Sequence, residues 1–260
     1  MFVGVSTWDF SSRGVSYDPD AANIFSRMTA PQSEARMSLI NDAVVNMKDE
    51  GIWPNLDIFH VSASADSQSG RINWINGSYT LVAVNAPVHQ VDRGFTGDGA
   101  TSYLRNGYNT STAAKLLQNS NTHGVVTLTK QLANRGDYGT SSNLIGSQST
   151  SDNALFVKDM TASFNFSTIT TSVKSHNTVS RNSSGSFDVY KDGAYVSSVT
   201  VSSSARENLE WYMCGYNNGG TLVGTTRQVA AMYAGGNLTS TQIAALNTIL
   251  DTYFTGVGIS

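Results

Sequence analysis

The pattern of apolar and polar positions divides the chain into a short helical stretch followed by a long stretch with strand character. Residues 18–30 and 31–51 place apolar side chains at three- and four-residue spacing, which predicts two amphipathic helices. Residues 53–61 are apolar with no clear period and fit either a strand or a helical turn. Residues 1–18 contain turn formers and predict an extended arm.

Beyond residue 70, short apolar or alternating runs are separated by clusters of Gly, Asn, Ser and Asp. Such runs are typical of antiparallel strands, and their regular spacing favours a sandwich or barrel over βαβ units. One helix closes the pattern over residues 239–254, with Thr239 or Ser240 as its predicted cap and Gly256 as its stop. The predicted strands cover residues 72–75, 79–84, 94–95, 102–105, 124–132, 143–147, 154–158, 162–168, 178–181, 187–191, 194–199, 209–215 and 228–235.

Composition supports a folded chain and excludes several partners. Of the 260 residues, 40% are apolar, which is enough for a large core, and only 13% are charged, so Ser, Thr, Asn and Gly must supply the polar surface. The net charge of −3 and the lack of a basic cluster argue against nucleic acid and against an anionic membrane surface. No apolar run reaches the ~20 residues of a membrane span, so we expect no membrane insertion.

The single cysteine, Cys214, excludes an intrachain disulfide and a cysteine-rich zinc site. It lies in an apolar run, so we expect a small buried side chain rather than a reactive thiol. The lack of disulfides fits synthesis in a reducing cytosol. The first residues have no basic segment followed by a long apolar one, so we expect no secretory signal.

Three motifs carry a family resemblance over about residues 70–255. They are FTGDGATSYL at 95–104, the hairpin signal YKDG at 190–193, and LTSTQI at 238–243, where a helix starts. Together they resemble concanavalin A-like, or laminin-G-like, jelly-roll domains. The resemblance implies a mainly β jelly-roll sandwich with a short N-terminal helical segment and a C-terminal helix.

The helical stretch together with WPNLD at 53–57 and DRGFTGDG at 92–99 resembles tailed-bacteriophage virion proteins of the tail or its fibres. The resemblance implies residues 1–70 as an attachment segment and 71–260 as a sandwich that binds host-surface glycan. It also implies other virion proteins as partners, assembly in the host cytoplasm, release by lysis and a homo-oligomer, for which we expect a trimer. A purely structural head decoration or cement protein stays open as the alternative. Packing of the N-terminal region wholly on its own sandwich would count against attachment.

The sequence lacks the usual signs of catalysis. Hydrolysis of a glycosidic bond by two carboxylates needs acids about 5–10 Å apart, and no predicted strand presents such a pair on one face. Glu207 and Glu210 are three positions apart and would face opposite ways on a strand. The four histidines are isolated and no metal-ligand spacing occurs. We therefore expect no enzyme, no catalytic residue, no metal and no cofactor, with a glycan-degrading enzyme as the least favoured hypothesis.

Two turn-rich stretches, 134–139 and 215–220, combine amides, an aromatic side chain and flexible backbone. Ligand-binding residues concentrate on loops over a rigid scaffold, whereas Trp53 and Trp211 fit the core better. The alternative is that both stretches are ordinary strand connections. The candidate ligand-binding residues are Arg135, Asp137, Tyr138, Tyr216, Asn217 and Asn218.

Overall fold

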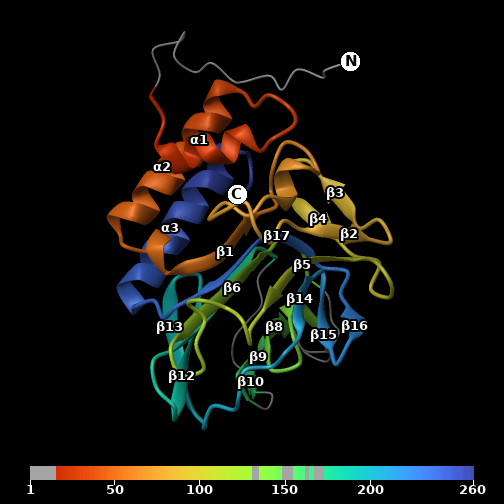
Figure 1. The fold of residues 1–260 in the computed structure, drawn as a ribbon, viewed down its shortest axis with the longest axis vertical. Helices are drawn as coiled ribbons and strands as arrows, with labels where there is room; N and C mark the ends of the chain where they lie inside the picture. Colours follow the sequence, from red (N-terminus) through yellow and green to blue (C-terminus); the bar gives the residue numbers. More distant parts are fainter. Residues whose placement is uncertain (1–15, 131–134, 148–154, 162–163, 167–172) are drawn as a thin grey trace.

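Two antiparallel sheets form a β-sandwich, and three helices lie together on one side of it (Figure 1). The computed structural model describes residues 16–130, 135–147, 155–161, 164–166 and 173–260, and all counts of helices, strands and contacts refer to these residues. The prediction of a mainly β sandwich with an N-terminal helical segment and a C-terminal helix is confirmed. None of the helices in the described residues is long and apolar enough to cross a lipid bilayer.

The helix-side sheet, which packs against the helices, is built around β17 (Gln228–Gly235), a strand buried along its whole length. One side of β17 pairs with β6, and the other pairs with β4 and then with β1. A strand buried on both faces is usually mostly apolar, and β17 is apolar apart from Gln228 and the terminal Gly235. The strand order is β13 (Ala194–Thr200), β12 (Ser186–Lys191), β11 (Ser175–Arg181), β6 (Asn121–Thr127), β17, β4 (Gly94–Thr96) and β3 (Val88–Gln90), and β1 (Leu56–Val61) pairs with β17 off this path.

The far sheet faces the helix-side sheet across the sandwich. Its order is β10 (Phe164–Phe166), β9 (Leu155–Asp159), β8 (Asn143–Ser147), β7 (Arg135–Gly139), β14 (Glu210–Met213), β5 (Tyr103–Asn109) and β2 (Val82–Val84). A separate hairpin, β15 (Gly215–Asn218) and β16 (Thr221–Gly224), follows β14. Cys214 separates β14 from β15 because its φ of 65° breaks the extended backbone, so the single strand predicted over 209–215 is two strands.

Local sequence explains the start of each helix. Asp18 caps α1 (Pro19–Ser26) and Ser33 caps α2 (Glu34–Asp49). Thr239 caps α3 (Ser240–Gly256), and its hydroxyl and the Gln242 side chain form a reciprocal capping box, which confirms the predicted start. Two 3-10 turns, Trp53–Asn55 and Ser69–Arg71, precede β1 and follow it, so residues 53–61 contain both of the structures the sequence allowed.

Alternation along the central strands creates two hydrophobic cores. On β17, Met232 and Ala234 face the inner core between the sheets, whereas Ala231 and Tyr233 face the outer core under the helices. The inner core contains Trp211 and Cys214, both fully buried, as the sequence predicted. The outer core is made by residues of α1, α2, α3, β1 and the helix-side sheet.

The boundary predicted at residue 70 does not separate two cores. From the first predicted part, β1 pairs with β17 of the second along Leu56–Val61. Gln242 of α3 donates hydrogen bonds to the carbonyls of Glu50 and Gly51, just after α2. The described part of 1–70 therefore packs on its own sandwich, while residues 1–15 of the predicted arm lie outside the described residues.

Several predicted strands differ from the observed ones in their bounds or are absent from the described residues. Residues 72–75 form a loop, because Asn73 Oδ1 accepts the backbone N–H groups of Phe59 (2.9 Å) and Ile75 (3.2 Å). The strand predicted over 124–132 begins earlier, as β6, and its last two residues lie outside the description. Residue 154 and all but 164–166 of the strand predicted over 162–168 also lie outside it. The hairpin at Asp192-Gly193 is confirmed, since both residues have positive φ.

Candidate functional site

The structure brings together the two stretches that the sequence selected for ligand binding. We call them the β7–β15 patch, comprising Arg135–Gly139 and Gly215–Asn218. Thr140, just after β7, forms a parallel bridge with Asn217, and the Tyr216 ring lies over Gly136, where an added Cβ would come within 2.8 Å of it. The prediction that 134–139 is a loop is wrong, because Arg135–Gly139 is strand β7, paired with β8; Asn134 lies outside the described residues.

Half of the six candidate side chains in the β7–β15 patch lie below its surface. Tyr138 is buried in the inner core, with its hydroxyl against Nδ1 of His123. Asn217 is also buried and holds the turn after β15, accepting from the backbone N–H of Gly220 at 2.7 Å. Arg135 and Asn218 are exposed, and Tyr216 is partly exposed. Direct contact with a ligand therefore remains a prediction for these last three.

Asp137, the sixth candidate, forms a buried ion pair. Its carboxylate lies 2.7 Å from Nη2 of Arg227, and both side chains are almost fully buried. Burial raises the pKa of Asp137 to about 7, and the nearby Arg227 opposes this rise. Nη2 of Arg227 also donates to the carbonyl of Arg135 at 2.9 Å. The pair thus anchors β7 beneath the patch rather than facing solvent.

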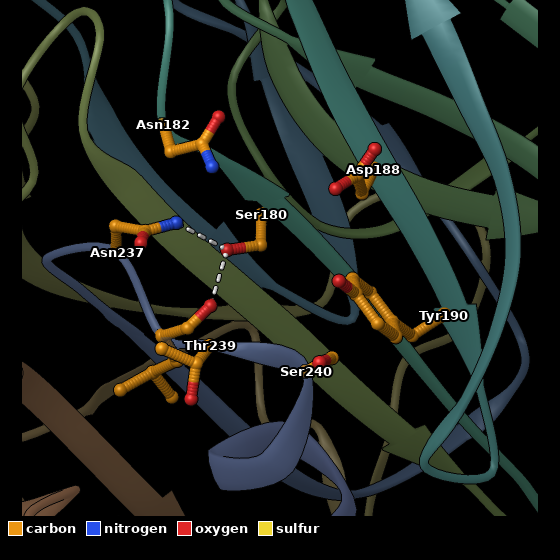
Figure 2. Close-up of a pocket in the computed structure, with 8 residues that line it drawn as sticks. Ser180, Asn182, Asp188, Tyr190, Asn237, Thr239 and Ser240 are labelled. Atoms are coloured by element: carbon orange, nitrogen blue, oxygen red, sulfur yellow. Dashed lines mark hydrogen bonds between the residues drawn. The ribbon is translucent and has the colours of Figure 1, made fainter.

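A cavity of about 260 Å³ lies elsewhere, between the outward face of β11 and β12 and the start of α3. We call it the β12–α3 pocket. Figure 2 shows Asp188 and Tyr190 on one side of the opening, Asn182 and Asn237 on the other, and Ser180 between them. The residues that line it are Ser180, Asn182, Asp188, Tyr190, Asn237, Leu238, Thr239 and Ser240.

Strand register positions one wall of the pocket. Asp188 and Tyr190 are two residues apart on β12 and so share its outward face, while Phe187 and Val189 point into the inner core. Ser180 on β11 is the direct cross-strand partner of Asp188. The pocket wall therefore follows from ordinary antiparallel pairing.

Hydrogen bonds fix the opposite wall, which is the connection from β17 to α3. Nδ2 of Asn237 donates to Ser180 Oγ at 2.8 Å, and Ser180 Oγ donates to the carbonyl of Leu238 at 3.0 Å (Figure 2). The backbone N–H of Leu238 donates to Thr122 Oγ1 at 2.8 Å. These bonds hold the connection in place, so the pocket is pre-organised.

Three polar groups that line the pocket are left without a polar partner within the described part of the chain. Among the described residues, no hydrogen bond or ion pair is found for the carboxylate of Asp188, the hydroxyl of Tyr190 or the amide of Asn182. Burial, followed by the nearby Asp188 carboxylate, raises the pKa of Tyr190, so its hydroxyl stays protonated and can donate at neutral pH. The pocket can thus accept, donate and present an aromatic ring to one ligand.

The sequence predicted no site at this pocket, although one signal was present. Phe187 to Tyr190 alternates apolar, acidic, apolar and aromatic residues, and that alternation indicates a strand with Asp188 and Tyr190 on one outward face. Nothing in the sequence placed Asn237 opposite them, because that proximity depends on the pairing of β11 with β6 and of β6 with β17.

No family model and no curated protein matches the chain. Solved structures do share its fold. A mutant of Trypanosoma rangeli sialidase displaying trans-sialidase activity aligns with a TM-score of 0.56 and 15% identity, over 84% of this chain and 39% of that one. Botulinum neurotoxin type C, described as depending on two ganglioside molecules for cell entry, aligns with a TM-score of 0.54 and 12% identity. That match covers 77% of this chain and 52% of the neurotoxin chain.

The binding domain of botulinum neurotoxin DC, solved in complex with rat synaptotagmin II, aligns similarly, with a TM-score of 0.51 and 12% identity over 76% of this chain and 52% of that one. The chain thus spans between about two fifths and half of these proteins. At such low identity the likeness establishes a shared β-sandwich fold and nothing about a phage particle.

The likeness corrects the expectation that the chain is not an enzyme. That expectation depended on the absence of paired carboxylates, and it is wrong as an exclusion, because part of a sialidase chain shares this fold. Sialidases are an exception to the two-carboxylate rule, since their nucleophile is a tyrosine. Missing acid pairs therefore do not exclude a glycan-acting chain, and fold alone does not establish a reaction.

Proposed function

We propose that this chain binds carbohydrate through the β12–α3 pocket. The observation that carries the proposal is the group of side chains without partners among the described residues, Asp188, Tyr190 and Asn182, placed around one pre-organised cavity. Binding sites typically combine a concave surface with a few convergent polar groups that fix orientation.

The chemistry of these groups suits a polyhydroxylated ligand. Each sugar hydroxyl both donates and accepts, so it can pair with the Asp188 carboxylate, the Asn182 amide or the Tyr190 hydroxyl. Hydrogen bonds to a charged group contribute more than neutral ones, about 1.5–3 kcal/mol. The β-sandwich neighbours support the proposal, because they include Trypanosoma rangeli sialidase in complex with sialic acid and a botulinum neurotoxin whose cell entry depends on two ganglioside molecules.

A glycan array with the purified chain tests the proposal, followed by titration of the best ligand. We expect Asp188→Asn to weaken that ligand at least about tenfold, which corresponds to 1.4 kcal/mol. Asp42→Asn is the matched control, because it makes the same chemical change on the exposed surface of α2, away from the pocket. Equal affinities for Asp188→Asn and the control, or no glycan bound by the wild type, would refute the proposal.

The place of the chain in a particle is a separate proposal, supported only by the sequence resemblance. It includes a tail or fibre position, virion partners, a trimer and release by lysis, with head decoration or cement as the alternative. The packing of α1 and α2 on their own sandwich argues against residues 16–70 as a free attachment arm. Locating the chain by immunogold labelling of intact phage particles tests the position, and absence from every particle would end this proposal.

A further inference from the structure

The outward face of the helix-side sheet continues beyond the β12–α3 pocket onto β13, its edge strand. The pairing of β12 with β13 sets Ser198 directly beside Asp188 and Tyr195 directly beside Tyr190. Directly opposed residues of an antiparallel pair share a face, with Cβ atoms about 4.5–5.5 Å apart. The pocket wall and this extension are therefore one continuous surface.

Tyr195 is the unusual residue on that extension. It is 57% exposed, although large aromatic side chains normally bury most of their area. Its ring lies 5.8 Å from the ring of Tyr190 in a T-shaped arrangement, so a residue of the pocket wall holds it. Tyr195 thus presents a positioned aromatic surface beside the opening.

The charge of the pocket narrows the class of ligand. Among the described residues that line it, Asp188 supplies a carboxylate and none is Lys or Arg. The nearest arginine in sequence to Ser180 is Arg181, which alternates to the interior and pairs with Asp159 at 2.6 Å. A carboxylated or sulfated sugar in the pocket would therefore face repulsion from Asp188 with no opposing cation among the lining residues.

Given the proposed carbohydrate-binding function, on which this step depends, we infer that the site takes a neutral oligosaccharide of at least two units. One unit occupies the β12–α3 pocket and hydrogen-bonds to Asp188. The next unit lies on Tyr195 with the apolar face of its ring against the phenol. An acidic sugar, such as the sialic acid of the Trypanosoma rangeli sialidase complex, does not fit this arrangement.

The test titrates the best-binding neutral disaccharide of the array, its component monosaccharides and its sialylated derivative. We expect the disaccharide to bind about tenfold more tightly than either monosaccharide, a difference of 1.4 kcal/mol. Tyr195→Ala should abolish that advantage and leave monosaccharide affinity unchanged, whereas Tyr195→Phe should keep it. Tyr103→Ala, which removes a partly exposed ring from β5 of the far sheet, is the matched control and should leave the affinity unchanged. Tyr216→Ala separately tests the β7–β15 patch.

Each outcome assigns a failure to one step. If Asp188→Asn weakens binding but Tyr195→Ala does not, the pocket stands and the second unit on Tyr195 is refuted. Tighter binding of the sialylated derivative refutes the neutral class. If no sugar binds the wild type, the proposed function fails and this inference fails with it. Loss of binding in Tyr216→Ala moves the site to the β7–β15 patch and overturns both.

Discussion

Replacing Asp159 by Asn should destabilise the protein strongly, because it leaves a buried cation without its partner. Arg181 has no exposed surface, and its Nε donates to Asp159 Oδ2 at 2.6 Å. Its other donors reach the carbonyls of Asp159, Ser183 and Val201 at 3.0 to 3.3 Å. In the variant these carbonyls remain, but the only carboxylate paired with the guanidinium among the described residues is gone.

The expected loss is about 3 kcal/mol in the free energy of unfolding. Breaking a buried ion pair by removing one partner typically costs roughly 3–5 kcal/mol, and the remaining carbonyls and the Phe187 ring, 5.3 Å from the guanidinium carbon, favour the lower end. For a chain of this size, ~1 kcal/mol shifts the melting temperature by about 2–4 °C, so we expect a fall of roughly 6–12 °C.

Equilibrium urea unfolding, followed by tryptophan fluorescence, measures the effect. Asp20→Asn is the matched control, because it removes a carboxylate that is 45% exposed and paired with Lys48 at 2.6 Å. Exposed pairs contribute about 0–1 kcal/mol. The double variant Asp159→Leu, Arg181→Met should recover much of the lost free energy of unfolding, since neither charge stays buried. A loss in Asp159→Asn no larger than in the control would refute the reasoning.

Three further changes give distinct results. Burial lowers the pKa of His60 to about 3. The neutral side chain therefore contributes fully to the free energy of unfolding above the unfolded-state pKa of about 6.5, and this contribution falls by about 1.4 kcal/mol per pH unit as the pH drops towards 3. His60→Gln should flatten that part of the stability profile measured by urea unfolding. Gly94→Ala should prevent stable folding, because φ is +100° and the new Cβ would lie 2.1 Å from a carbonyl of β17, whereas Gly185→Ala, in open space, should shift the melting temperature by less than about 2 °C. Asn237→Ala should weaken glycan binding several-fold in the same titration and leave the melting temperature within about 4 °C of the wild type, and unchanged affinity would show that this wall needs no anchoring.

Local signals predicted much of the fold. The closing helix begins at Thr239 because Thr and Gln three residues apart make a capping box. The β12–β13 hairpin turns where Asp192-Gly193 can take positive φ. The sequence failed where tertiary contacts override local preference. The polar, glycine-containing Arg135–Gly139 is a strand because it pairs with β8, and Arg227 lies 2.7 Å from the carboxylate of Asp137 that this strand buries.

The candidate site was less accessible from the sequence. Asp188 and Tyr190 share a face by simple alternation, but Asn237 joins them only after β11, β6 and β17 lie side by side. Neither the composition nor the spacing of residues predicts that Asn237 lies near Asp188 and Tyr190. The prediction that the chain is not an enzyme failed for a different reason. It considered only pairs of carboxylates, which are one of several known arrangements for cleaving a glycosidic bond.

The outer core has a consequence for synthesis on the ribosome. Phe254 on α3 packs in that core with Phe59 on β1 and Met47 on α2, although most of the domain lies between Phe254 and the other two in sequence. Contacts between such distant segments form slowly, because a long loop must close first. The apolar outer face of the helix-side sheet therefore stays uncovered until residue 254 has left the exit tunnel. During that interval the nascent chain presents a surface that chaperones recognise and that other nascent chains can pair with, so a slower decoding rate over residues 236–254 should lower the yield of soluble protein.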